Sequence, residues 1–213
     1  MQFFLNQNGT AVVEAIIETI QANAKYLSEI DGAIGDGDHG INMNKGVTLC
    51  KKELASRETG LADALKILSR ILMMEIGGAM GPLYGTFFKA MSKACQDKER
   101  IDAGVFHEML RAALAGVQDI GGAQVGDKTM LDTLVPAVEA YEAALQDGQD
   151  FSAALKSMQA AAAEGKESTK SLVAKVGRAS RLGERSKGNL DPGATSCYLI
   201  LNSAADAIVA LIE

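Results

Sequence analysis

Residues 31–44 read Asp-Gly-Ala-Ile-Gly-Asp-Gly-Asp-His-Gly-Ile-Asn-Met-Asn, and this segment organises the rest of the chain. Its three carboxylates, Asp31, Asp36 and Asp38, are separated by glycines that let the backbone fold tightly. We therefore expect an irregular loop in which the three acids converge. Converged carboxylates repel one another unless a hard cation lies among them, and oxygen ligands suit Mg²⁺ or Ca²⁺.

The same segment has two other interpretations. Asp-Gly-Asp is also typical of an ordinary solvated turn, and the residues alone leave that alternative open. A calcium-binding EF-hand loop is excluded because it requires a glutamate at its twelfth position, where this chain has Val47.

Composition and charge exclude several classes of protein. With 213 residues and a net charge of -6, we expect a single domain over residues 1–213 that binds neither nucleic acid nor an anionic membrane. The three cysteines, Cys50, Cys95 and Cys197, lack metal-site spacing and are expected to be buried thiols. No N-terminal signal and no apolar run of about 18 residues is present, so we expect a cytoplasmic protein.

Apolar residues outside the acidic segment recur at helical spacing and predict an all-α fold without strands. Thr10 is expected to cap the first helix, Gly77-Gly78 to close the third, and Pro136 to kink the sixth without ending it. Met73-Met74 and Phe87-Phe88 are expected in the core. The predicted helices run over residues 13–27, 43–54, 61–76, 83–94, 105–120, 130–145, 151–172 and 197–211.

The connections between these helices differ in composition. Eight helices with short links tend to pack as antiparallel neighbours, so every odd-to-even connection should lie at one end of the molecule. Those connections, residues 31–44, 77–81, 121–128 and 177–193, are the glycine-rich ones. The even-numbered helices would all begin there, and their unpaired N–H groups suit phosphate.

These features together predict a site for a magnesium nucleotide and for phosphoryl transfer. The aspartates would hold Mg²⁺ that bridges to phosphate oxygens, and nearby cations would contact the phosphates. His39 contacts phosphate or donates a hydrogen bond behind the ligands; both roles are open. The expected cations are Lys128, Arg178, Arg181, Arg185 and Lys187.

Four longer motifs in the same order resemble the nucleotide-binding L subunit (DhaL) of bacterial dihydroxyacetone kinase over nearly the whole chain. That resemblance implies an eight-helix antiparallel up-and-down barrel with Mg-ADP or Mg-ATP at one end. The motifs are residues 34–44, 77–88, 126–130, and a last one in three pieces, 177–180, 183–186 and 191–196.

The resemblance also implies which residues form the site. Asp31, Asp36 and Asp38 match the family's ligands for two Mg²⁺ ions. The nucleotide contacts are matched by His39, Gly40, Ile41, Asn42, Ala79, Met80, Gly121, Met130, Arg178, Asp191, Pro192 and Gly193.

An activity and partners are implied as well. In the phosphotransferase-system branch of this family, an M subunit phosphorylates the bound ADP, and the phosphoryl group then passes to dihydroxyacetone on a K subunit. A homodimer is left open. Met80 stands where the family usually has a serine that contacts phosphate. That difference suggests a related ketose such as erythrulose as the substrate. The alternatives are an ATP-dependent kinase subunit for such a ketose, or a nucleotide-sensing regulator.

Overall fold

The fold is taken from a computed structural model that describes residues 2–212. Within that range it contains eight α-helices, three 3-10 helices and one two-stranded sheet. The α-helices are α1 (Thr10–Ile34), α2 (His39–Leu54), α3 (Leu61–Glu75), α4 (Met80–Cys95), α5 (Ala103–Gly121), α6 (Leu131–Gln146), α7 (Phe151–Ser168) and α8 (Pro192–Leu211). The shorter elements are β1 (Phe3–Leu5), β2 (Arg100–Asp102), η1 (Asn6–Asn8), η2 (Thr169–Ser171) and η3 (Arg178–Ser186).

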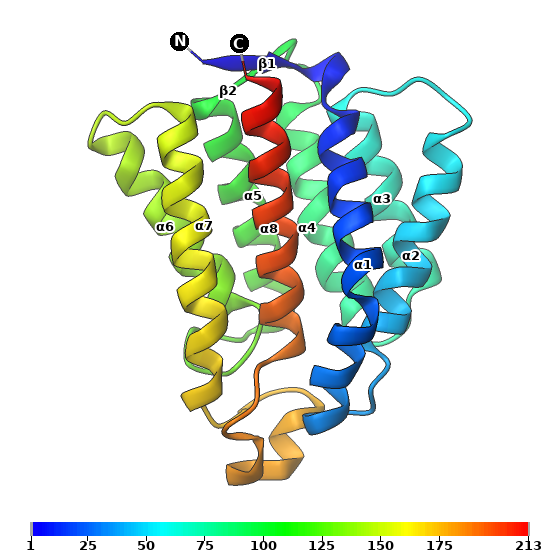
Figure 1. The fold of residues 1–213 in the computed structure, drawn as a ribbon, viewed down its shortest axis with the longest axis vertical. Coiled ribbons are helices and arrows are strands. Elements are labelled where there is room, and N and C mark those ends of the chain that lie inside the picture. Colours follow the sequence, from blue (N-terminus) through cyan, green and yellow to red (C-terminus); the bar gives the residue numbers. More distant parts are fainter. Residues whose placement is uncertain (1, 213) are drawn as a thin grey trace.

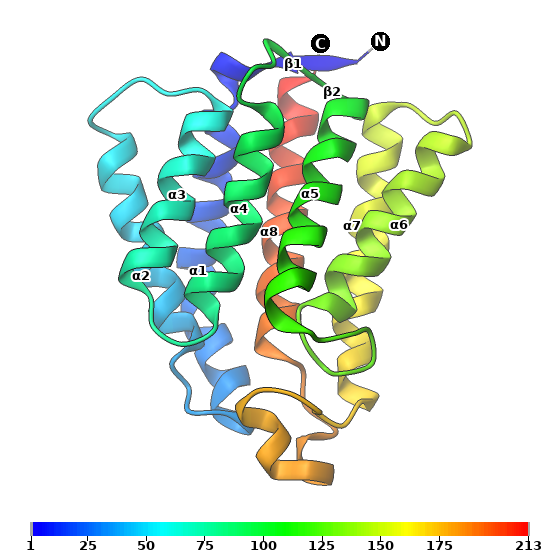
Figure 2. The same ribbon diagram turned by 180° about the vertical axis from the view of Figure 1, so that it is seen from behind.

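The eight α-helices form a closed ring. Each helix packs against the one before it in the chain, and α8 returns to pack against α1. Successive helices run in opposite directions around this ring, as the two opposite views in Figures 1 and 2 show. The predicted all-α, antiparallel eight-helix barrel is confirmed.

Apolar side chains from all eight helices fill the inside of the ring as one cluster. The largest are aromatic: Phe87 and Phe88 meet edge to face at 5.0 Å between ring centroids, and Phe106 meets Tyr141 at 5.5 Å. Burying such a side chain stabilises a fold by about 2–3 kcal/mol, so this core can hold the connections at the ends of the helices in place. Met74, expected in the core, is instead 72% exposed at the end of α3.

The prediction of no strand is wrong. Strands β1 and β2 pair antiparallel with Phe4 opposite Ile101, and both side chains are buried. Each strand is only three residues long, too short to show the alternation of polar and apolar residues that marks a strand in sequence. In Figure 1 this ribbon covers one end of the helical ring, beside both chain termini.

The acidic segment is more helical than predicted. Helix α1 continues through Asp31 to Ile34 and α2 begins at His39, so only residues 35–38 are irregular. Gly37 makes the turn with a φ of 78°. The glycines before the loop were read as helix breakers, whereas Gly32 lies inside the last turns of α1, where the packing of the ring overrides its low helix propensity.

Two predicted caps are also wrong. Thr10 is the first residue of α1, and its hydroxyl bonds to the backbone carbonyl and hydroxyl of Thr59 instead of capping its own helix. Helix α3 ends at Glu75 and leaves through Ile76 in an extended conformation, so Gly77-Gly78 do not close it. The bonds of Thr10 join it to a residue 49 positions away, which local sequence does not encode.

Helix α6 continues through Pro136, as predicted. Proline has no N–H, so the carbonyl of Asp132 one turn earlier loses its helical donor. Gly165 of α7 packs against that carbonyl so closely that a Cβ atom on Gly165 would overlap it. The proline and the glycine thus lie at the same close contact between α6 and α7.

Helix α8 is the one helix in the described chain long and apolar enough to cross a membrane, by length and composition only. The sequence predicted no such segment, because no apolar run approaches about 18 residues. More than half of it, 56%, is buried inside the ring, and buried core helices pass the same test. It packs between α7 and α1.

Candidate functional site

A cavity of about 400 Å³ lies at the end of the ring opposite the β1–β2 ribbon. All four odd-to-even connections contribute to its lining, with Asp36, Gly78, Thr129 and Gly177 as examples. The predicted meeting of these connections at one end is therefore confirmed. The volume falls in the range of about 300–1,000 Å³ that is usual for small-molecule sites.

Three carboxylates converge on one side of the cavity. Asp31 lies in the last turn of α1, Asp36 in the loop and Asp38 just before α2, and one oxygen of each lies within 4.8 Å of the others. Asp31 Oδ2 accepts a hydrogen bond from the His39 backbone N–H at 3.1 Å, which fixes its orientation. Gly35 packs so closely on Asp31 that a Cβ atom there would overlap the carboxylate.

This donor set fits Mg²⁺. The ion takes oxygen ligands at about 2.0–2.1 Å, so oxygens within 4.8 Å of one another can share an ion or a closely spaced pair. Arg178, the first residue of η3, reaches the same carboxylates from the connection between α7 and α8: its guanidinium pairs with Asp36 and lies 3.7 Å from Asp38. The acids and Arg178 thus form one charged cluster at the cavity wall.

Four helix N-termini meet at the cavity. The N-cap residues of α2, α4, α6 and α8 all line it: Asp38, Ala79, Met130 and Asp191. Each helix directs the positive end of its dipole and its unpaired N–H groups toward its first turn. The cavity is therefore suited to an anion such as a phosphate chain.

Three of these N-termini have no side-chain cap. Asp38, Ala79 and Met130 make no capping bond, whereas Asp191 caps α8. In contrast, Asp102 and Asp150 cap α5 and α7 at the far end, accepting bonds from Val105 and Ala153. The first turn of α4 therefore keeps backbone donors available beside the cavity.

His39 is tied into a buried hydrogen-bonded chain. Its Nε2 lies 2.8 Å from Ser196 Oγ, which lies 2.6 Å from the Tyr84 hydroxyl, and Tyr84 donates to the Gly193 carbonyl at 3.1 Å. Burial lowers the pKa of His39 to about 4, so its ring is neutral at pH 7. These hydrogen bonds join α2, α4 and α8 at the cavity wall.

Asp191 caps α8 and is also buried. Its Oδ2 accepts from the Ala194 N–H at 2.7 Å. Burial is the largest cause that raises the pKa of this carboxyl, to about 7. The cap at the start of α8 is thus close to its protonation midpoint at neutral pH.

The predicted role of Lys128 as a cation facing the ligand is wrong in this structure. Its residue lines the cavity, but its ammonium donates to three backbone carbonyls of the connection between α7 and α8. Arg181, Arg185 and Lys187 do not line the cavity. Among the predicted cations in the described chain, Arg178 is the one whose charged group meets the acidic cluster.

Most residues expected to contact nucleotide do line the cavity, although their roles stay predictions. The exceptions are Gly40, Ile41 and Asn42: Gly40 packs against the backbone of Ala24, and Ile41 is 66% exposed. The expected contacts in the lining are His39, Ala79, Met80, Gly121, Met130, Arg178, Asp191, Pro192 and Gly193.

Sequence reasoning missed Tyr84 and Ser196. Tyr84 is buried in α4 among apolar neighbours, where its hydroxyl gives no signal in a helical pattern. Ser196 lies one turn into α8, and its polar contacts depend on two other helices. Both residues do lie within quoted motifs, residues 77–88 and 191–196, which was the available hint.

Residues 33–206 match the sequence profile of the DAK2 domain, which is most of the chain. The chain belongs to the DAK2 domain family. The matched range of this DAK2 domain begins just before the acidic loop and ends within α8, so it includes all four connections around the cavity.

Curated relatives are similar to this DAK2 domain over nearly their whole length. The ADP-binding subunit DhaL of PEP-dependent dihydroxyacetone kinase 1 from Listeria innocua is 42% identical, over 87% of this chain and 88% of its own. The corresponding subunit from Escherichia coli is 36% identical over 88% and 90%. That of the PTS-dependent kinase from Lactococcus lactis is 40% identical over 90% and 92%. The resemblance to DhaL subunits is confirmed.

A solved structure shares the fold. The dihydroxyacetone kinase from C. freundii in complex with AMP-PNP and Mg²⁺ superposes with a TM-score of 0.70 and 26% identity. The match covers 92% of this DAK2 domain but 33% of that longer chain.

Proposed function

We propose that this chain is the ADP-binding subunit of a dihydroxyacetone kinase that depends on the phosphoenolpyruvate phosphotransferase system. The observation that carries the proposal is the cluster of Asp31, Asp36 and Asp38 beside a cavity ringed by four helix N-termini. The relatives that are 36–42% identical over nearly the whole chain are named as such subunits.

Each part of the cavity has a function in this proposal. The three aspartates would hold Mg²⁺, two ions as the resemblance implies, and the metal would neutralise phosphate charge. The backbone donors at the start of α4 and the guanidinium of Arg178 contact the phosphate chain and stabilise charge on the transferred phosphoryl group. Leu83, Val117 and Met130 offer apolar surface for the base.

Neutral His39 and the hydrogen bond from its backbone keep the aspartates in place. Asp31 receives that N–H, and the imidazole is held by Ser196. Since burial lowers the pKa of His39, the ring adds no positive charge beside the metal ligands. Catalysis in this site therefore consists of positioning and charge neutralisation, with no covalent intermediate on this chain.

The phosphoryl donor and acceptor are proposed to be other proteins: an M subunit that phosphorylates bound ADP, and a K subunit that carries dihydroxyacetone. Exposed apolar side chains at the cavity end support contacts with partners there. Ile41, Met74, Ile120, Val125 and Val176 are each 37–72% exposed, next to one of the four connections.

Dihydroxyacetone is favoured over erythrulose as the acceptor. The D-erythrulose kinase from Mycolicibacterium smegmatis is 33% identical, and the match covers 34% of its length. Met80 is the reason to test erythrulose as the acceptor, because its side chain supplies no hydroxyl for phosphate. However, Met80 is the first residue of α4, where its backbone N–H can take that role.

Binding of Mg-ADP tests the site directly. Isothermal titration calorimetry is expected to show Mg-dependent ADP binding that Asp36→Asn abolishes while helix content stays unchanged. Asp97→Asn, an exposed aspartate beyond α4 at the far end, is the matched control and should bind like the wild type. Unchanged ADP affinity in Asp36→Asn would remove Asp36 from the metal site.

Reconstitution tests the partners and the ketose. The purified chain should retain ADP through gel filtration. With M and K subunits and the phosphoenolpyruvate system, it should phosphorylate dihydroxyacetone. Free exchange of nucleotide, with ATP replacing the M subunit, would favour an ATP-dependent kinase, and better turnover of erythrulose would identify that ketose as the acceptor.

A further inference from the structure

Lys128 combines an unusual backbone with a buried charge. It is the one non-glycine residue with positive φ among residues 2–212, at 63°, and it is 2% exposed. A buried ammonium is costly unless its three N–H groups find acceptors. Its Nζ donates to the carbonyls of Thr169 at 2.7 Å, Leu172 at 3.3 Å and Asn189 at 2.5 Å, so all three are used.

Two of these carbonyls, those of Thr169 and Leu172, belong to the 3-10 turn that follows α7. The helix ends at Ser168 and continues as η2 to Ser171, and the last carbonyls of a helix lack helical donors. A positive charge at that end is favourable because it opposes the negative end of the helix dipole. Lys128 therefore places its charge just beyond the end of α7, from the connection between α5 and α6.

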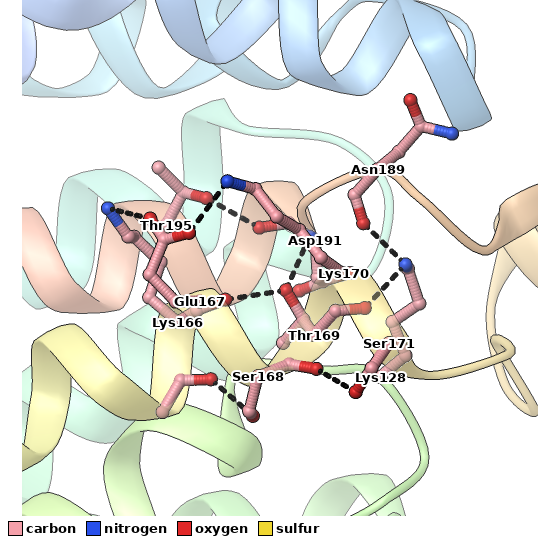
Figure 3. Close-up of polar contacts among 11 residues, drawn as sticks. Lys128, Lys166, Glu167, Ser168, Thr169, Lys170, Ser171, Asn189, Asp191 and Thr195 are labelled. Atoms are coloured by element: carbon pink, nitrogen blue, oxygen red, sulfur yellow. Dashed lines mark hydrogen bonds and ion pairs between the residues drawn. The ribbon is translucent and has the colours of Figure 1, made fainter.

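The third carbonyl, that of Asn189, connects Lys128 to the far end of the loop between α7 and α8. Leu172 and Asn189 lie at the two ends of the loop that carries Arg178, so one ammonium binds both ends of that loop. Figure 3 shows the Lys128 side chain between Thr169 and Asn189. The Gly188 N–H donates to the Lys170 carbonyl at 2.7 Å and so also joins the two ends of this loop.

Thr169 extends the link to α8. Its hydroxyl accepts from the Asp191 N–H at 3.0 Å and donates to the Lys166 carbonyl at 2.7 Å (Figure 3). Asp191 in turn caps α8 through the Ala194 N–H. The start of α8, which lines the cavity, is thus joined to the end of α7 that Lys128 holds.

We propose that Lys128 is a positioning residue for the nucleotide. By fixing both ends of the loop over residues 172–189 and, through Thr169, the start of α8, it holds Arg178 and the turn from Asp191 to Gly193 in their places at the cavity. Lys128 does not contact the nucleotide in this role. The inference rests on the proposed binding of Mg-ADP.

Lys128→Met and Lys175→Met test the proposal as a matched pair. Methionine keeps the apolar stem of Lys128 and removes the ammonium. Lys175 is an exposed lysine of the same loop that pairs with Asp127 at 3.1 Å, so its loss changes the local charge equally without freeing the three carbonyls. The measurements are the Kd for Mg-ADP and the amide hydrogen exchange of residues 172–191 without nucleotide.

Lys128→Met is expected to bind Mg-ADP about tenfold more weakly or worse, and to exchange faster in the loop, since the carbonyls of Thr169, Leu172 and Asn189 lose the ammonium that links them. Lys175→Met should bind within about twofold of the wild type. Weaker binding with unchanged exchange would indicate direct contact with phosphate. Faster exchange with unchanged Kd would indicate a purely structural role. Either result overturns the proposal.

A second pair of variants, at Thr169, tests the proposal if Lys128→Met does not fold. Thr169→Val removes the acceptor for the Asp191 N–H but keeps the carbonyl that Lys128 binds, and Thr169→Ser keeps the hydroxyl as control. Unchanged Mg-ADP affinity in Thr169→Val would reject the link to α8. A wild-type chain that does not bind Mg-ADP would reject the proposed function and this inference with it, whereas wild-type binding with unaltered Lys128→Met affinity would reject this inference alone.

Discussion

Two buried side chains of the site, His39 and Asp191, have pKa values displaced in opposite directions. Burial lowers the pKa of His39 to about 4 and raises that of Asp191 to about 7. Both residues therefore favour their neutral forms in the folded state. A fall in pH should lower the free energy of unfolding through His39 and raise it through Asp191.

For His39, the free energy of unfolding should fall as the pH drops from its ordinary pKa of 6.5 to about 4, because only the unfolded state then takes up a proton. The full shift corresponds to about 3 kcal/mol. His39→Gln, which retains a hydrogen-bonding group, should lose this acid-side decline. Urea unfolding at several pH values measures it, and an unchanged slope in the variant would contradict the assignment.

For Asp191 the sign is reversed. Its folded-state pKa of about 7 exceeds the ordinary 3.8, so its contribution is complete below 3.8 and is lost as the pH rises through 7. Asp191→Asn keeps a good capping acceptor and should flatten this decline between pH 4 and 7. Asp150→Asn, the exposed cap of α7, is the control for the substitution itself. Equal pH profiles for the two variants would refute the prediction.

The sequence predicted the ligand-like residues better than their surroundings. Asp31, Asp36 and Asp38 were found because charge repulsion within a short glycine-rich segment is a local property. The three acceptors of Lys128 were not found, because they lie 41 to 61 residues along the chain. The hydrogen bonds of Tyr84 and Ser196 were not predicted either, because their partners also lie far away in the sequence.

Among the helices, the approach of α2 to α1 depends on Gly40. A Cβ atom at this position would overlap the Ala24 carbonyl oxygen and lie 2.7 Å from Ser28 Oγ. The obstacle is largely backbone, which cannot rotate away. Gly40 is therefore a packing residue in this structure, and its expected contact with nucleotide stays untested.

Gly40→Ala should destabilise the protein by about 3 kcal/mol or more, because one helix must move away from the other. Gly77→Ala is the matched control: nothing lies within 4 Å of its added Cβ, and the cost should stay within about 0.5 kcal/mol. Denaturant unfolding followed by circular dichroism measures both. Similar stabilities for the two variants would show that α1 and α2 adjust freely.

Helix existence could be predicted from the sequence, but several ends could not. Apolar spacing identified all eight helices, since each has one side facing the common core. At the start of α1, Thr10 bonds to the distant Thr59, and α3 ends before its glycines, at Glu75. The β1–β2 ribbon joins residues almost a hundred positions apart and left no local pattern.

At the level of the whole molecule, the cavity is shared by four connections, so a ligand there contacts every quarter of the ring. The up-and-down topology made this arrangement predictable from the sequence, because antiparallel neighbours bring alternate connections to one end. The shape of the cavity was not predictable, since it depends on side chains from six helices, α1, α2, α4, α5, α6 and α8, and from all four connections.

Mg-ADP should accordingly stabilise the whole fold. At a free concentration of about 100 times Kd, the free energy of unfolding should rise by about 2.7 kcal/mol, and the Tm should rise with it. Calorimetry with and without EDTA measures the effect, which should vanish when Mg²⁺ is removed. Asp36→Asn serves as the control, and a Tm increase that persists in EDTA would argue against a metal-bridged ligand.

Both ends of the described chain lie beside the β1–β2 ribbon, away from the acidic cluster (Figures 1 and 2). An affinity tag, a fluorescent protein or a biosensor anchor fused at either end would therefore sit on the side of the molecule remote from the nucleotide. A chip carrying the protein in this orientation would leave the opening facing the flow, where subunits and ligands could be injected without steric obstruction.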